Sequence, residues 1–141
     1  MAVGSSARSK ARKRALDVLF ESEVQGTAPT DALAALERRQ EQPLNEYVRV
    51  LVEGVDDHRE RIDELLATYS SGWTLDRMPA VDRNVLRIGT WELLWGQVPD
   101  AVAISEAVVL VTDLSTDDSP AFINGVLGRI LDIREHLVLD T

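Results

Sequence analysis

The stretch Val81-Asp-Arg-Asn-Val-Leu-Arg-Ile-Gly-Thr-Trp-Glu-Leu-Leu-Trp95 contains the most apolar helical pattern in this 141-residue chain. Its apolar side chains recur every three or four residues, which is the spacing that gathers side chains along one side of an α-helix. Trp91 and Trp95 form an i,i+4 pair within it. Gly96 and Pro99 follow, and both residue types are typical of a helix end. The stretch therefore predicts a helix over residues 81–95.

Helical spacing continues on both sides of this segment. Ser5, Ser6 and Ser9 are candidates to cap a first helix, and Ser119 is predicted to cap the last one, with Pro120 at its first helical position. Strict alternation bounded by hairpin turns is missing from the sequence. The sequence predicts an all-α fold of about seven helices with no long linker. The other expected helices cover residues 8–25, 30 or 31 onward, 44–58, 62–70, 100–114 and 119 onward.

The composition is that of an ordinary globular protein, with 45% hydrophobic and 28% charged residues, and the length fits a single domain over residues 1–141. The chain has no cysteine and only two isolated histidines, which leaves no thiolate metal site, disulfide or cysteine nucleophile. Phosphate-binding glycine loops and nucleophile elbows are missing as well. We therefore expect no cofactor, no metal and no enzymatic activity. The apolar runs are too short for a membrane span and no signal peptide is evident, so we expect no membrane partner and a cytoplasmic protein.

The charge is strongly polarised along the chain. The net charge is −9, yet residues 1–14 carry five cations and no acid, whereas the remaining residues carry ten arginines and 24 acids. The acidic body argues against sequence-blind nucleic-acid binding. The basic N-terminal arm (residues 1–14) is nevertheless compatible with an anionic partner that binds at this end of the chain. The arm leads into the first helix. Cations are unfavourable at a helix N-terminus because they oppose the helix dipole, so their presence there invites a functional explanation. A solvated tail is an equally good interpretation from these residues alone.

Several other residues admit two interpretations. Gly125 interrupts an apolar helical pattern, and close helix packing is favoured there. Phe122 is either a core residue, which is slightly favoured, or an exposed platform for a nucleobase. The adjacent Asp117 and Asp118 are expected to stabilise the helix start that follows rather than to form an acid–base pair. The tryptophans are core candidates: Trp73, Trp91 and Trp95.

Three stretches together resemble the NusB family of bacterial transcription antitermination factors. They are Ala11-Arg-Lys-Arg-Ala-Leu-Asp-Val-Leu-Phe20, Val81 through Leu93 as quoted above, and Val102-Ala-Ile-Ser-Glu-Ala107 followed by Asp118-Ser-Pro-Ala-Phe-Ile-Asn-Gly-Val-Leu127. The resemblance runs, with gaps, over residues 8–130. It implies two packed antiparallel helical bundles. It also implies a protein that pairs with NusE, a small-subunit ribosomal protein, holds single-stranded boxA RNA of ribosomal RNA leaders, and acts on the transcription elongation complex to promote read-through.

The resemblance also implies site residues by position. The residues that correspond to the family's RNA-binding positions are Arg8, Lys10, Arg12, Lys13, Asp118 and Phe122. The residues that correspond to its partner-binding surface are Phe20 and Asp82.

The sequence departs from the family pattern where the family often has basic residues, at Thr112, Asp113, Pro120 and Ala121. Residues 88–128 contain six acids and no lysine or arginine. RNA contact near Phe122 therefore has to rest on stacking and on the arm. If all five cations contact phosphates of a single strand, the slope of log affinity against log salt concentration (the salt slope) is about −3.5 at most. We therefore expect the protein alone to bind RNA weakly and to need a basic partner protein.

One alternative stays open at this point, and a second is expected to be excluded. The first is a helical protein-interaction or self-association module with weak or lost RNA binding. A homodimer is slightly favoured, because the expected RNA face has little positive charge and the helix over residues 81–95 is rich in apolar side chains. The second is a methyltransferase module, which we expect to be excluded because the sequence ends at Thr141 with no room for a cofactor-binding α/β domain and has no catalytic cysteine.

Overall fold

The computed structural model describes residues 6–137 and confirms the all-helical prediction. Within those residues there are seven α-helices, two short 3-10 helices and no strand. The elements are α1 (Ala7–Gln25), α2 (Pro29–Arg39), α3 (Glu46–Asp57), α4 (Arg59–Tyr69), η1 (Leu75–Arg77), α5 (Ala80–Leu94), α6 (Asp100–Leu114), α7 (Ser119–Ile133) and η2 (Arg134–His136).

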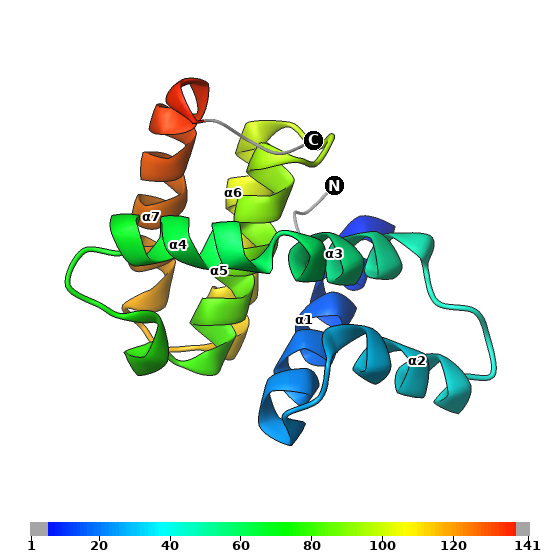
Figure 1. Ribbon diagram of the computed structural model, residues 1–141. Helices are drawn as coiled ribbons and strands as arrows, with labels where there is room; N and C mark the ends of the chain where they lie inside the picture. The colour runs from blue at the N-terminus through cyan, green and yellow to red at the C-terminus, as the bar shows by residue number, and fades with distance from the viewer. Residues whose placement is uncertain (1–5, 138–141) are drawn as a thin grey trace.

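The helices form two packed groups that share α5 (Figure 1). Helices α1, α2 and α3 pack against one another on one side, and α4, α5, α6 and α7 pack together on the other. Helix α5 contacts α1 and α3 of the first group as well as its own neighbours. Ten of its 15 residues are buried, as expected for a helix covered on most sides. The apolar side chains over residues 81–95 are therefore used inside the fold, which removes that argument for a homodimer.

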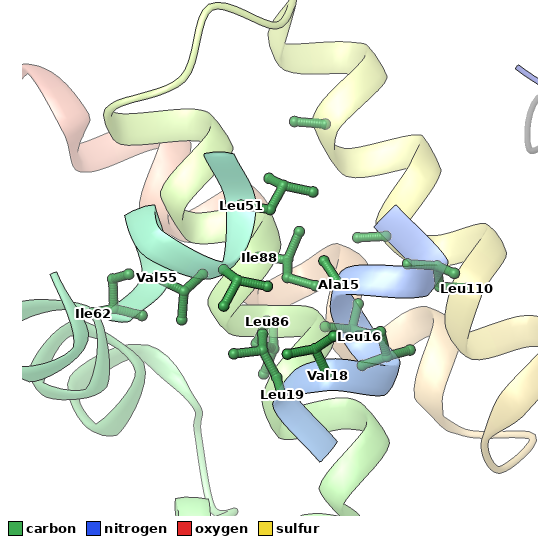
Figure 2. Close-up of a cluster of buried hydrophobic side chains, with 14 of the residues drawn as sticks. Ala15, Leu16, Val18, Leu19, Leu51, Val55, Ile62, Leu86, Ile88 and Leu110 are labelled. Atoms are coloured by element: carbon green, nitrogen blue, oxygen red, sulfur yellow. The ribbon is translucent and has the colours of Figure 1, made fainter. Parts of the chain in front are cut away.

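One continuous hydrophobic cluster runs through both groups. Figure 2 shows Leu16 and Leu19 of α1 next to Leu86 and Ile88 of α5, with Leu51 of α3 nearby. Each of these five side chains is at most 3% exposed. Burial of a leucine or isoleucine side chain contributes about 1.5–3 kcal/mol, so this shared cluster holds the two groups of helices together.

Some helix ends follow the predicted signals, whereas α2 begins at Pro29 instead of residue 30 or 31 and α4 begins at Arg59 instead of residue 62. The Ser6 hydroxyl accepts a hydrogen bond from the Ser9 N–H at 3.0 Å and caps α1, while Gly26 ends it in the left-handed conformation with φ 68°. Ser5 lies outside the described residues. Helix α3 begins later than predicted because the Asn45 side chain caps it. Ser119 is not the cap of α7: Asp118 occupies that position, without a side-chain capping bond, and Ser119 is already helical.

Close helix packing occurs at glycines other than the predicted Gly125. A Cβ atom at Gly125 would meet only the Arg129 guanidinium, at 3.4 Å. A Cβ atom at Gly54 of α3 would lie 2.4 Å from the Trp91 indole of α5, so glycine is required where these helices cross. By contrast, a Cβ atom at Gly128 of α7 would meet nothing within 4 Å.

We expect alanine to have opposite effects at two of these helical glycines. Gly54→Ala forces the Trp91 ring to move and should lower the free energy of unfolding by about 1–3 kcal/mol. Gly128→Ala should leave it unchanged or raise it by up to about 1 kcal/mol, because alanine favours the helix and has room. Urea denaturation of both variants checks the difference. A neutral Gly54→Ala would contradict the close crossing.

A second set of side chains joins the C-terminal half of α1 to α5 and α4. Arg83 donates to the Glu23 carboxylate and to the carbonyl oxygens of Leu75 and Met78, and Arg87 bridges Glu23 and Asp63. The hydrogen bond from Arg83 is the main cause that lowers the pKa of Glu23 below its ordinary value, with the charges of Arg83 and Arg87 adding to it against the effect of burial.

This lowered pKa predicts an acid-sensitive contribution to stability. Because the pKa of Glu23 is lower in the folded than in the unfolded state, its stabilisation is present above the ordinary value of 4.5 and is lost as the pH falls through the folded value. Removing the carboxylate with Glu23→Gln should therefore cost most at neutral pH and progressively less below pH 4.5. Denaturation curves across pH measure this, and Glu41→Gln, at an exposed carboxylate, is the control whose difference from wild type should not vary in this way.

Candidate nucleic-acid interface

The first two turns of α1 carry all five cations of the basic arm, and the structure separates them by helical position. Arg8, Lys10 and Lys13 are exposed and Arg14 is half-buried. Among residues 6–137, no carboxylate lies within ion-pairing distance of Arg8, Lys10 or Arg14, whereas Lys13 lies 3.5 Å from Asp17. Cations that no carboxylate neutralises are available to phosphate oxygens.

Arg12 corrects the prediction, because its side chain is only 2% exposed. Its Nε atom donates to both carboxylate oxygens of Glu92 at 3.0 and 3.1 Å, and its Nη2 atom lies 2.9 Å from Glu92. Its Nη1 atom lies 3.5 Å from Glu106. The assignment of Arg12 as an RNA contact is therefore wrong: its guanidinium is inside the protein and occupied by two carboxylates.

Further polar groups complete this buried network. The Ser9 hydroxyl donates to Glu106, and the Tyr47 hydroxyl of α3 donates to Glu92 of α5. Burial, then the hydrogen bond to Glu92 and its charge, raises the pKa of Tyr47, so the phenol stays protonated and donates. Burial alone lowers the pKa of Arg12, but the hydrogen bond and charge of Glu92 raise it above its ordinary value. The network joins α1 to α3, α5 and α6.

Two of the cations of α1, the exposed Lys10 and the half-buried Arg14, border a groove of about 310 Å³. Lys10 and Arg14 form one wall, and the loop between α2 and α3 forms the other with the side-chain amides of Gln40, Gln42 and Asn45. Cations and amides both suit phosphate and sugar oxygens. Glu37, Glu41 and Glu46 line another hollow of the same loop, where their carboxylates would repel a phosphate.

The two predicted residues on α7 lie in the second group of helices. Asp118 is exposed at the start of α7. Phe122 is half-buried, belongs to the core packing, and meets Trp73 edge-on with ring centroids 4.9 Å apart. All three tryptophans pack against the core, as predicted.

The two predicted partner-binding residues differ in accessibility. Phe20 is 41% exposed on α1, one turn before Val24, which is 69% exposed. Asp82 is completely buried and accepts a hydrogen bond from Ser115, in the turn between α6 and α7. The assignment of Asp82 to a contact surface is therefore corrected: it braces the turn that precedes Asp118.

Within residues 6–137, no group of three or more His, Cys, Asp or Glu side chains is arranged to hold a metal ion. In the same part of the chain, no helix has both the length and the apolar content that a membrane crossing needs.

These features define a class: an all-helical binding protein whose first helix presents cations suited to a nucleic acid. Comparison with known proteins identifies the family. The NusB family model matches residues 9–132, and the chain belongs to the NusB family. A transcription antitermination protein NusB from Nocardioides sp. is 66% identical over 130 residues, which cover 89% of this chain and 94% of that protein. Antitermination proteins of this family are transcription factors and not enzymes.

Solved structures agree with this assignment. T. maritima NusB is 31% identical, with a TM-score of 0.79 over 91% of this chain and 92% of that one. A chain in a crystal structure of the antitermination factors NusB and NusE in complex with dsRNA is 27% identical, with a TM-score of 0.79 over 89% of this chain and 96% of that chain.

The buried ion pair predicts a large and rescuable loss of stability. Arg12→Met leaves Glu92 buried without its cation and should lower the free energy of unfolding by about 3–5 kcal/mol. The double variant Arg12→Met/Glu92→Leu removes both charges and should recover much of that loss. Urea denaturation of Arg12→Met, Glu92→Leu and the double variant gives the coupling free energy between the two residues. Equal losses in all three variants would contradict the coupling between these two residues.

Proposed function

We propose that this protein binds single-stranded boxA RNA of ribosomal RNA leaders together with NusE and promotes read-through by RNA polymerase. The observation that carries the proposal is the set of exposed cations on the first two turns of α1, which the buried Arg12 holds in place. The solved complex of related factors contains NusE and RNA, which supports the class of both partners. The protein then acts within the transcription elongation complex in the cytoplasm, with its two helix groups working as one domain.

The protein alone binds this RNA weakly. With Arg12 buried, four cations of the arm remain, which limits the salt slope on a single strand to about −2.8. Residues 88–128 add six acids and no cation, so Asp118 and the surface around it do not attract phosphates. A basic partner protein supplies the missing positive charge, and an acidic surface steers such a partner toward the complex.

We assign the partner contact to Phe20 and the neighbouring Val24. Both are exposed apolar side chains on the last turns of α1, away from the cations at its start. One helix thus serves two contacts, with RNA at its N-terminal end and NusE at its C-terminal end. Asp82 acts through Ser115 on the position of Asp118 rather than by direct contact.

A specific observation favours self-association as the second candidate. An open groove of about 730 Å³ lies between α6 and α7, lined mainly by Ala101, Ile104, Val108, Val109 and Leu131. An exposed apolar groove is a candidate for contact with another protein chain. Sedimentation distinguishes the two states: a single 15.6 kDa species at high micromolar concentration contradicts the homodimer.

Removal of Lys10 and Arg14, two cations without a carboxylate partner, should weaken RNA binding in a salt-dependent way. Lys10→Ala/Arg14→Ala should reduce the magnitude of the salt slope by about 1.4, because each charge contributes about 0.7 on a single strand. The matched control is Arg38→Ala/Arg77→Ala, which removes two exposed cations from other surfaces. Fluorescence anisotropy of labelled boxA RNA, with and without NusE at several salt concentrations, measures both variants.

Three RNA arms make this experiment specific: single-stranded boxA, the same sequence as a duplex, and a scrambled single strand. The proposal requires that NusE strengthen binding to single-stranded boxA above the other two. Absence of binding with and without NusE would overturn it and leave a protein-interaction module. An equal effect of the control variant would show that total charge, and not the start of α1, governs binding.

A further inference from the structure

Arg83 of α5 clamps the loop between α4 and α5 (residues 70–79) to the end of α1. Its Nε and Nη2 atoms donate to the Glu23 carboxylate of α1, with 2.9 Å between Nε and Oε1. Its Nη1 atom donates to two backbone carbonyls of the loop, at 2.6 Å to Leu75 and 3.1 Å to Met78. All three nitrogen atoms of the guanidinium are therefore occupied, and the side chain is 15% exposed.

Arg87, one turn later on α5, offers a close comparison. It bridges Glu23 and Asp63 and donates to the Asn84 side chain. Within residues 6–137, none of the hydrogen bonds of the Arg87 side chain involves an atom of the α4–α5 loop. The two arginines share Glu23, but Arg83 is the one that connects this carboxylate to the loop.

The clamped loop lies next to the exposed apolar pair of α1. Glu23 follows Phe20 by three residues, which places the two side chains side by side on the helix surface, and Val24 lies one turn after Phe20. Leu75 and Pro79 of the loop are half-buried. The loop therefore offers an apolar continuation of the surface formed by Phe20 and Val24.

A partner protein needs more surface than this pair provides. A specific interface covers about 800 Å² on each protein, far more than two side chains supply. On the side of α2 the neighbouring surface is charged, because Arg38 is exposed and Arg39 lies 3.6 Å from Glu21. The centre of an interface is depleted of charged residues, which favours an extension of the contact toward Leu75 and Pro79.

We propose that Arg83 is a positioning residue for the partner contact: it holds the α4–α5 loop beside Phe20 and Val24, so that both present one ordered surface to NusE. The inference rests on the proposed pairing with NusE and adds the residue that orders the binding surface. A loop that is already held loses little conformational freedom when the partner binds, which strengthens binding. Without the clamp, NusE has to order the loop itself.

Arg83→Lys and Arg87→Lys test this role as a matched pair. Each variant keeps a positive charge near Glu23 but loses the planar guanidinium, and the single nitrogen of a lysine at 83 cannot serve the carboxylate and both carbonyls together. Isothermal titration of the full-length protein with NusE should show a loss of affinity of about five- to tenfold for Arg83→Lys and of less than about twofold for Arg87→Lys. Urea denaturation of both variants measures how much stability each has lost.

Hydrogen exchange gives a readout that a loss of global stability does not move. In the wild type, the amides of Arg77 and Met78 donate to the Thr74 carbonyl and are therefore protected. In Arg83→Lys without NusE, the amides of the loop should exchange faster than in the wild type, and NusE should restore their protection. Arg87→Lys should leave exchange in the loop unchanged. Unchanged loop exchange in Arg83→Lys, or an equal loss of NusE affinity in both variants, overturns the positioning role.

A second pair of variants keeps the test valid if Arg83→Lys does not fold. Pro79 and Pro99 occupy equivalent positions before α5 and α6, with φ of −54° and −55°. Alanine removes the same backbone restriction at both positions, but Pro79 alone belongs to the clamped loop. Pro79→Ala should therefore weaken NusE binding by about two- to fivefold, whereas Pro99→Ala should not. Equal effects of the two alanine variants contradict the proposal.

These outcomes separate the positioning role from the proposed function. The variants leave every cation of the basic arm in place, so salt-dependent RNA binding without NusE should match that of the wild type. Binding of NusE to the wild type without a specific effect of Arg83→Lys overturns the positioning role and leaves the proposed function intact. Absence of NusE binding by the wild type overturns both.

Discussion

The buried ion pair between Arg12 and Glu92 is the constraint on which the rest of this structure depends. It joins the first helix to the central helix α5 across 80 residues of sequence, and Glu106 and Tyr47 bring α6 and α3 into the same network. Its value does not lie in stability alone, because a well-packed apolar pair could replace a buried ion pair without loss. An ion pair, however, fixes direction: a guanidinium with two carboxylates fits in one rotation of α1 about its axis.

That rotation decides which cations face solvent. Helical spacing turns Arg8 toward the Tyr47 ring, and it turns Lys10 and Arg14 toward the loop between α2 and α3. One buried arginine thus distributes its basic neighbours over two adjacent faces of the helix. The unfavourable placement of positive charge at a helix N-terminus is compensated by the internal carboxylates and used at the surface. Structure and function are connected here by helical geometry.

The sequence carried enough information for the helices but not for their contacts. Periodicity and capping residues such as Gly26 identify local structure, because those signals act within a few residues. The burial of Arg12 and Asp82 depends on Glu92 and Ser115, which are distant in sequence, so position within a basic motif was a poor guide to accessibility. A signal was present: Glu92 stands within the most apolar helix, and a carboxylate there needs a cation. The close approach at Gly54 likewise depends on Trp91, which only the packing of α3 on α5 brings near.

Positive and negative charges are distributed unevenly between the start of α1 and the rest of the molecule. The acidic residues lie on the body, where they oppose RNA, while the basic arm at the start of α1 holds five cations and no acid. Few charges give a shallow dependence on salt and a weak nonspecific attraction, so discrimination among RNAs has to come from contacts with bases.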